Sequence, residues 1–184
     1  MELHNYLHSL SPKILDICHL LVTMYYMKVI LDADCLIKLT KAGLKEAVCR
    51  AFTITIPRLV KEEVVDRGKA KELPDALIID KNVREGLIKV KTDTTSKATV
   101  GEKEALTLFQ KGGFDAIGSD DKRFIRQLRM FNIPYLTPAV FIAVMVKQGN
   151  IKTSKALLIL DALSEYISDD EYATVKLFLD SRRS

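Results

Sequence analysis

Acidic residues stand at four separated places along this chain, each directly after an apolar run or within an amphipathic segment. Asp32 follows the apolar run 29–31 at once. The other acidic positions of this kind are Glu62 and Glu63, Glu102 and Glu104, and Asp120 and Asp121. Clustered carboxylates repel one another at neutral pH unless cations lie between them, and Mg²⁺ and Mn²⁺ favour oxygen ligands. If the fold brings these positions together, they predict a site for Mg²⁺ or Mn²⁺.

Several other chemistries are excluded from the main body of the chain. All three histidines, His4, His8 and His19, lie within the first nineteen residues. Their position argues against a Ser-His-Asp triad, an H-E-x-x-H zinc site or a histidine general base later in the sequence. The sequence also contains no Walker loop and no G-x-G-x-x-G motif. Any catalysis in the main body is therefore assigned to carboxylates.

The segment around Asp32 predicts how the first acid is positioned. The short apolar run before it is typical of a strand that is buried on both faces, as in a parallel sheet. Asp32 would then lie at the carboxyl end of that strand, where open α/β sheets bind their ligands. The alternative is that Asp32 or Asp34 only caps the helix that follows.

The second acidic pair lies on a helix that the pattern predicts over 57–66, after a strand over 52–56. Glu63 falls within the apolar arc of this helix, and Glu62 falls outside it. A carboxylate on a buried face must be paired or bound to a metal. Glu63 is therefore the candidate ligand, unless it lies at the rim or pairs with Arg67.

The third acidic pair, Glu102 and Glu104, lies in the first turn of a helix predicted over 100–109. Carboxylates in a first turn interact favourably with the helix dipole, and this explains at least one of them without a site. The helical spacing does not choose between the two.

The fourth pair, Asp120 and Asp121, follows a short strand predicted over 114–118 and precedes a helix over 122–131. A helix N-cap explains one of these two acids, but it does not explain both.

Strands and helices alternate along the chain, which predicts an α/β fold with a mostly parallel sheet. A further helix is expected over 74–85, an edge strand over 87–91, a loop over 92–99 and a last short strand over 133–136. Helices are expected over 138–148, 152–166 and 169–182. Residues 1–26 fit no clear pattern and are expected to form a peripheral N-terminal extension.

Composition limits the compartment and the partners. The 184 residues carry a formal net charge of +4, which permits an anionic partner. Three cysteines without metal-ligand spacing favour a reducing compartment, and we expect the cytoplasm. No segment is long and apolar enough to span a bilayer, so no membrane is expected as a partner.

Residues 27–151 resemble a PIN domain, and are most similar to VapC-like prokaryotic proteins with a Gly-Glu-x-Glu-Ala motif. The resemblance is carried by the segments 29–37, 56–65, 101–106 and 119–124. It implies a three-layer α/β/α sandwich with four to five central strands, followed by a C-terminal helical extension over 152–184 that packs on the same domain.

The resemblance also implies a metal-dependent ribonuclease. Its acidic quartet would be Asp32, Glu63, Glu104 and Asp121, with Glu102 and Asp120 as neighbours that could take over as metal ligands. Asp34 stands where such proteins often carry Ser, Thr or Asn, and Ser119 matches a small hydroxyl residue. Both would lie beside the metal ligands.

The implied partner is RNA, bound through basic residues near the site. The candidates are Lys38, Lys41, Lys122, Arg123 and Arg126. A toxin role would add a cognate antitoxin protein, and a homodimer is a further expectation to test.

Two other functions stay open from the sequence. Asp32-Ala33-Asp34 also resembles the start of haloacid-dehalogenase-type phosphohydrolases, in which the first Asp is a nucleophile. That interpretation gives no role to Glu63 or to the Glu102 and Glu104 pair. The other alternative is a catalytically degenerate domain that binds RNA or a protein.

Overall fold

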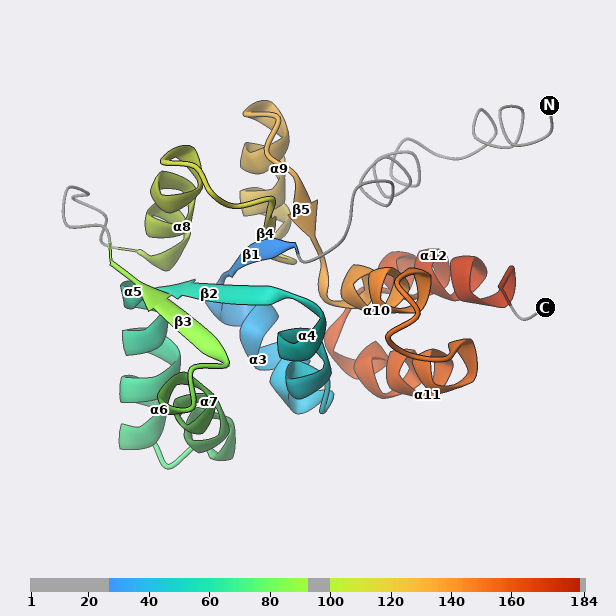
Figure 1. Ribbon diagram of the computed structural model, residues 1–184, viewed down its shortest axis with the longest axis horizontal. Coiled ribbons are helices and arrows are strands. Elements are labelled where there is room, and N and C mark those ends of the chain that lie inside the picture. Colours follow the sequence, from blue (N-terminus) through green and yellow to red (C-terminus); the bar gives the residue numbers. More distant parts are fainter. Residues whose placement is uncertain (1–26, 93–99, 183–184) are drawn as a thin grey trace.

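The centre of the protein is a five-stranded sheet in which every strand pair is parallel (Figure 1). The computed structural model describes residues 27–92 and 100–182. The strand order is β3-β2-β1-β4-β5. The strands are β1 (Lys28–Leu31), β2 (Thr53–Pro57), β3 (Ile88–Lys91), β4 (Ala116–Gly118) and β5 (Tyr135–Leu136). The predicted α/β class is confirmed, and the sheet is wholly rather than mostly parallel.

Helices cover both faces of this sheet. They are α3 (Ala33–Lys41), α4 (Lys45–Ala51), α5 (Arg58–Lys61), the π-helix η1 (Glu62–Asp66), α6 (Arg67–Ala70), α7 (Pro74–Arg84), α8 (Gly101–Gln110), α9 (Lys122–Met130), α10 (Pro138–Lys147), α11 (Thr153–Leu163), the 3₁₀ helix η2 (Ser164–Tyr166) and α12 (Asp169–Asp180). In β1, Val29 and Leu31 join the larger apolar cluster with α3 and α10, whereas Ile30 joins a smaller one beneath α8 and α9. Such alternation buries both faces, as the apolar run predicts.

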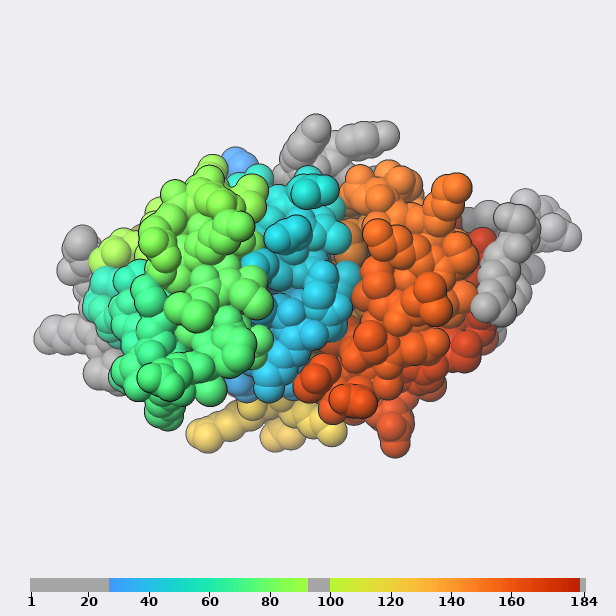
Figure 2. Space-filling view, turned by 90° about the horizontal axis from the view of Figure 1, so that it is seen from below, coloured from blue at the N-terminus to red at the C-terminus, as the bar shows by residue number. Residues whose placement is uncertain are grey.

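The C-terminal helices share the core of the sheet. Leu160 and Leu163 of α11 and Leu179 of α12 are fully buried in the larger cluster, together with nearly all of α10. Figure 2 shows α3 lying between the segment 58–84 and the C-terminal helices. The helices within 152–182 thus share one hydrophobic core with β1.

Two predictions about local structure are corrected. Pro57 is the last residue of β2 rather than the first residue of a helix, and the helix predicted over 57–66 is interrupted by the π-helix η1. The predicted N-terminal extension, 1–26, lies outside the described residues, as does the predicted loop from 93 onward.

Candidate active site

The carboxyl ends of β1 and β4 bring two predicted positions together. Leu31 pairs with Gly118, so Asp32 and Ser119 follow side by side, and the Asp32 N–H donates to the Gly118 carbonyl oxygen at 3.0 Å. A Cβ at Gly118 would lie 2.3 Å from Leu31 Cδ2, which explains the glycine at this close approach. The strand order reverses between β1 and β4, and such a switch point forms a crevice at the end of an open sheet.

Asp32 is both a helix cap and a buried acid. Its Oδ1 accepts a hydrogen bond from the Cys35 N–H at 2.8 Å, and only 4% of the residue is exposed. Burial raises its pKa to about 7, and the charges of Asp120 and Asp34 act in the same direction. Hydrogen bonds from Ser119 and Cys35 oppose this shift. Capping and a site role are therefore compatible for this residue.

The fourth acidic pair divides its roles, as the sequence predicts. Asp121 caps α9 by accepting a hydrogen bond from the Phe124 N–H at 2.6 Å. Asp120 forms an ion pair with Lys38, which belongs to α3. The other oxygen of Asp120, Oδ1, is buried and has no hydrogen-bond partner among the described residues. Asp120 therefore keeps one carboxylate oxygen for a further ligand.

Glu63 lies on the surface, so the prediction that it faces the core is wrong. The π-helix η1 has a wider turn than an α-helix, so the 100° steps of the prediction do not hold here. Val64 and Val65 are consequently both buried, and Glu63 rotates outward.

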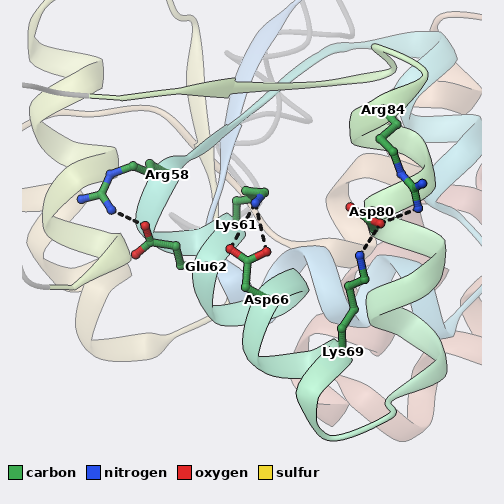
Figure 3. A network of polar contacts seen from close by, with 7 residues as sticks. All are labelled: Arg58, Lys61, Glu62, Asp66, Lys69, Asp80 and Arg84. Atoms are coloured by element: carbon green, nitrogen blue, oxygen red, sulfur yellow. Dashed lines mark hydrogen bonds and ion pairs between the residues drawn. The ribbon is translucent and has the colours of Figure 1, made fainter.

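Several charged residues near Glu63 pair with one another. Arg58 pairs with Glu62, and Lys61 pairs with Asp66 at 3.0 Å (Figure 3). Further along, Asp80 lies between Lys69 and Arg84. Glu63 forms no ion pair within the part of the chain that is described, so its carboxylate is available for a cation.

The structure separates Glu104 from Glu102. Glu104 is 2% exposed and accepts a hydrogen bond from the Leu59 N–H at 2.8 Å. Pro57 caps α5 without a side-chain hydrogen bond, so Glu104 supplies that cap from α8. Glu104 thus holds the start of the helical stretch that carries Glu63.

Glu102, by contrast, faces the other acids. It is half-buried, and its pKa is raised first by burial and then by the charges of Asp121, Asp34 and Glu63. The charge of Arg123 opposes this shift. Glu102 is therefore close to Glu63 on η1 and also to Asp121, which follows β4. We call Asp32, Asp34, Glu63, Glu102, Asp120 and Asp121 the acidic cluster.

A further acid near the site, Glu171, was not among the predicted site residues. It accepts a hydrogen bond from the Ala139 N–H of α10 at 2.8 Å. Burial raises its pKa, and Asp120 is close enough to add to the shift. The sequence pattern of α12 assigns Glu171 only to the first turn. Its spacing of four and eight residues from buried Val175 and Leu179 is the signal that places it on the inner face.

The predicted RNA-binding residues fall into two groups. Lys38 is engaged with Asp120, and the exposed Lys41 lies with its ammonium 5.5 Å from the centre of the Tyr166 ring. The remaining three are exposed on α9, where an anion can reach them: Lys122, Arg123 and Arg126.

The donor chemistry of the acidic cluster fits a divalent cation. All its members offer hard carboxylate oxygens, and Asp120 Oδ1 is buried without a partner among the described residues. Within 27–92 and 100–182, no three acidic, cysteine or histidine side chains are already arranged to bind a metal ion, so some of these carboxylates would have to turn toward an ion.

Residues 27–92 and 100–182 include no helix that is long and apolar enough to cross a membrane.

A family model described as a PIN domain matches residues 28–179, which covers the sheet, the acidic cluster and nearly all of α12. No curated protein and no solved structure matches the chain significantly.

Proposed function

Because the chain belongs to the PIN-domain family, whose members are generally metal-dependent nucleases, we propose that it hydrolyses phosphodiester bonds of RNA with Mg²⁺ or Mn²⁺. The observation that supports this proposal is the acidic cluster at the β1–β4 switch point. Beyond the effect of burial, the charges of Asp120 and Asp34 raise the pKa of Asp32. The charges of Asp121, Asp34 and Glu63 likewise add to the raised pKa of Glu102. A cation is the simplest partner for such a concentration of negative charge.

The proposed ligands differ in one residue from the quartet that the motif resemblance implies. Asp32, Glu63, Glu102 and Asp121 hold the metal, with Asp120 beside them. Glu104 has a structural role instead, because its carboxylate caps α5 and is almost fully buried. Asp34 is exposed, and Ser119 contacts Asp32 and Asp121, so these two act on the ligands rather than replace them.

Residues of the chain position the metal ligands and contact the RNA. Backbone amides of α3 and α9 hold the Asp32 and Asp121 carboxylates in fixed positions. A bound divalent ion supplies Lewis acidity for the scissile phosphate and lowers the pKa of water. Lys122, Arg123 and Arg126 contact the RNA backbone, which gives salt-dependent and largely sequence-independent affinity.

The alternative functions fit the structure less well. A haloacid-dehalogenase-type reaction would use Asp32 as a nucleophile and would leave Glu63 and Glu102 without a role. A degenerate binding module would not need a Glu63 carboxylate that pairs with no described residue while Glu62 and Asp66 are paired.

The test compares cleavage of single-stranded RNA by the wild type, Asp32→Asn, Glu102→Gln and Glu104→Gln. We expect the wild type to cleave in Mg²⁺ or Mn²⁺ and to lose activity in EDTA. Asp32→Asn and Glu102→Gln should bind Mn²⁺ weakly and cleave no RNA. Glu104→Gln is the matched control. It should keep Mn²⁺ binding and cleavage, while the weakened helix cap lowers its free energy of unfolding by about 1–3 kcal/mol.

Two results would contradict the proposed reaction, and a third would change one of its ligands. RNA binding without cleavage in any divalent metal would indicate a binding module. Release of phosphate from a small phosphomonoester, with an aspartyl-phosphate trapped on Asp32, would indicate the phosphohydrolase. If Glu102→Gln cleaves RNA normally and Glu104→Gln does not, the metal ligand on α8 is Glu104 and not Glu102.

A further inference from the structure

Lys38 is the cation that the fold itself places against the acidic cluster. It lies on α3, and its ammonium forms an ion pair with Asp120, which is 82 residues away in sequence. The two side chains are 28% and 10% exposed. No other lysine or arginine in the described part of the chain forms an ion pair with a member of the cluster.

The surroundings of Lys38 keep it charged. Burial alone would lower its pKa, but the hydrogen bond and charge of Asp120, with the charges of Asp34 and Glu171, outweigh burial and raise the pKa. Asp34 lies one turn before Lys38 on α3, whereas Asp120 follows β4 and Glu171 lies on α12. Acids from three parts of the fold therefore act on Lys38. Its ammonium therefore serves as a fixed positive charge at this edge of the sheet.

Within the described ranges, Asp120 is hydrogen-bonded through one of its two carboxylate oxygens. Lys38 contacts Oδ2, whereas Oδ1 is buried without a hydrogen-bond partner among the described residues. A buried carboxylate oxygen without a partner is costly, and a second cation near Oδ1 would remove that cost. A divalent ion and the Lys38 ammonium would then share one carboxylate, and two nearby positive charges repel each other.

We propose that Lys38 is a built-in competitor of the divalent ion: its ammonium neutralises Asp120 when no metal is present and weakens metal binding at the acidic cluster. This inference rests on the proposed function, because it assumes that the cluster binds a divalent ion. It assigns Lys38 a role in metal affinity instead of the RNA contact that the sequence suggests.

The proposal predicts two opposite effects of removing one charge. Lys38→Met should bind Mn²⁺ about tenfold more tightly than the wild type, equivalent to about 1.4 kcal/mol. In EDTA the same variant should melt at a lower temperature than the wild type, because Asp120 loses its counter-ion. A saturating concentration of Mn²⁺ should reverse that loss of thermal stability.

The test measures Mn²⁺ binding by calorimetry and melting temperature in EDTA and in Mn²⁺ on the full chain. Lys41→Met is the matched control, since it removes a lysine one turn away that pairs with no carboxylate of the cluster. Lys38→Gln keeps a hydrogen-bond donor for Asp120 and serves if Lys38→Met does not fold. In an Asp120→Asn background, Lys38→Met should change the Mn²⁺ affinity much less.

The outcomes separate this inference from the proposed function. Tighter Mn²⁺ binding by Lys38→Met, with no change in Lys41→Met, supports the competitor role. Equal Mn²⁺ affinity of Lys38→Met and wild type overturns the competitor role but does not contradict the metal site. If Lys38→Met also binds RNA more weakly, Lys38 contacts RNA as the sequence suggests. If neither the wild type nor any variant binds Mn²⁺, the metal site and this inference are both overturned.

Discussion

Carboxylates in this protein are held in place by the N-termini of helices. Asp32 and Asp121 cap their own helices, α3 and α9. Glu104 and Glu171 instead cap helices that are distant in sequence, α5 and α10. The backbone amides and the helix dipole favour negative charge at each of these places. This arrangement stabilises a concentration of acids that would otherwise repel one another.

Asp32 gives a prediction about pH. Its pKa is raised in the folded state from 3.8 to about 7, mainly by burial. The folded protein therefore binds this proton more tightly than the unfolded chain does. In EDTA, the free energy of unfolding should consequently fall as pH rises from about 4 to about 7, with a contribution of up to about 1.4 kcal/mol per pH unit. Above pH 7 this contribution should level off.

The difference between wild type and Asp32→Asn isolates this titration, because the amide does not ionise. Chemical denaturation at several pH values should show Asp32→Asn gaining stability relative to the wild type between pH 4 and pH 7. Mn²⁺ should reduce that difference by favouring the ionised carboxylate. A pH-independent difference in EDTA would show that Asp32 keeps its ordinary pKa.

The sequence could identify some of these acids but not their roles. Asp32 was found because a short apolar run ends at it, and the end of a parallel strand has a known position in a sheet. The choice between Glu102 and Glu104 could not be made, because both fit the first turn of α8. The contact with Leu59, 45 residues away, distinguishes Glu104 from Glu102, and such a contact leaves no local pattern.

At the scale of elements, the positions of most helices and strands could be predicted from the sequence. The helix predicted over 74–85 is observed as α7, and Gly86 follows it with a positive φ of 74°, which a glycine adopts readily after the end of a helix. The strands β1, β2 and β4 appear within a few residues of their expected ranges. The π-helix could not be foreseen, since an expectation built on 3.6 residues per turn has no place for it. This one wider turn is what moves Glu63 from the inner face to the surface.

The contact between α5 and α8 brings two acidic segments together and depends on Gly101. A Cβ at this position would lie 2.6 Å from Val60 Cγ2, and Val60 is fully buried. We expect Gly101→Ala to lower the free energy of unfolding by about 1–3 kcal/mol, because the two helices must separate to admit the methyl group. Mn²⁺ affinity should fall as well, because Glu102 follows Gly101 directly.

A double-mutant cycle with Val60→Ala tests this explanation by denaturation. Removing the Val60 methyl groups creates the space that Gly101→Ala needs, so the double variant should be more stable than the sum of the two single effects predicts. Additive effects would show that Gly101→Ala acts through the helix itself and not through this contact.

At the scale of the molecule, one core joins the sheet to the C-terminal helices. The motif positions put a boundary after residue 151, with the helices beyond it expected to pack on the same domain. In the structure, Leu160, Leu163 and Leu179 lie in the same cluster as Val29 and Leu31 of β1. Glu171 adds a polar link from α12 to the start of α10. The local sequence pattern reports that these helices are amphipathic, but it does not report what covers their apolar faces.

A chain that ends at residue 151 should therefore fail to fold. It would expose α10, which is buried over eight of its ten residues and is apolar nearly all round. We expect this fragment to lack a cooperative unfolding transition and to aggregate, as judged by circular dichroism and gel filtration.

Two point variants on α11 test the same conclusion in the full-length chain. Leu160→Ala, at a fully buried position, should cost about 2–5 kcal/mol, whereas Leu158→Ala, at a 71% exposed one, should change stability by less than about 0.5 kcal/mol. A folded fragment, or a separate melting transition that Leu160→Ala alone displaces, would show that the C-terminal helices are an independent unit.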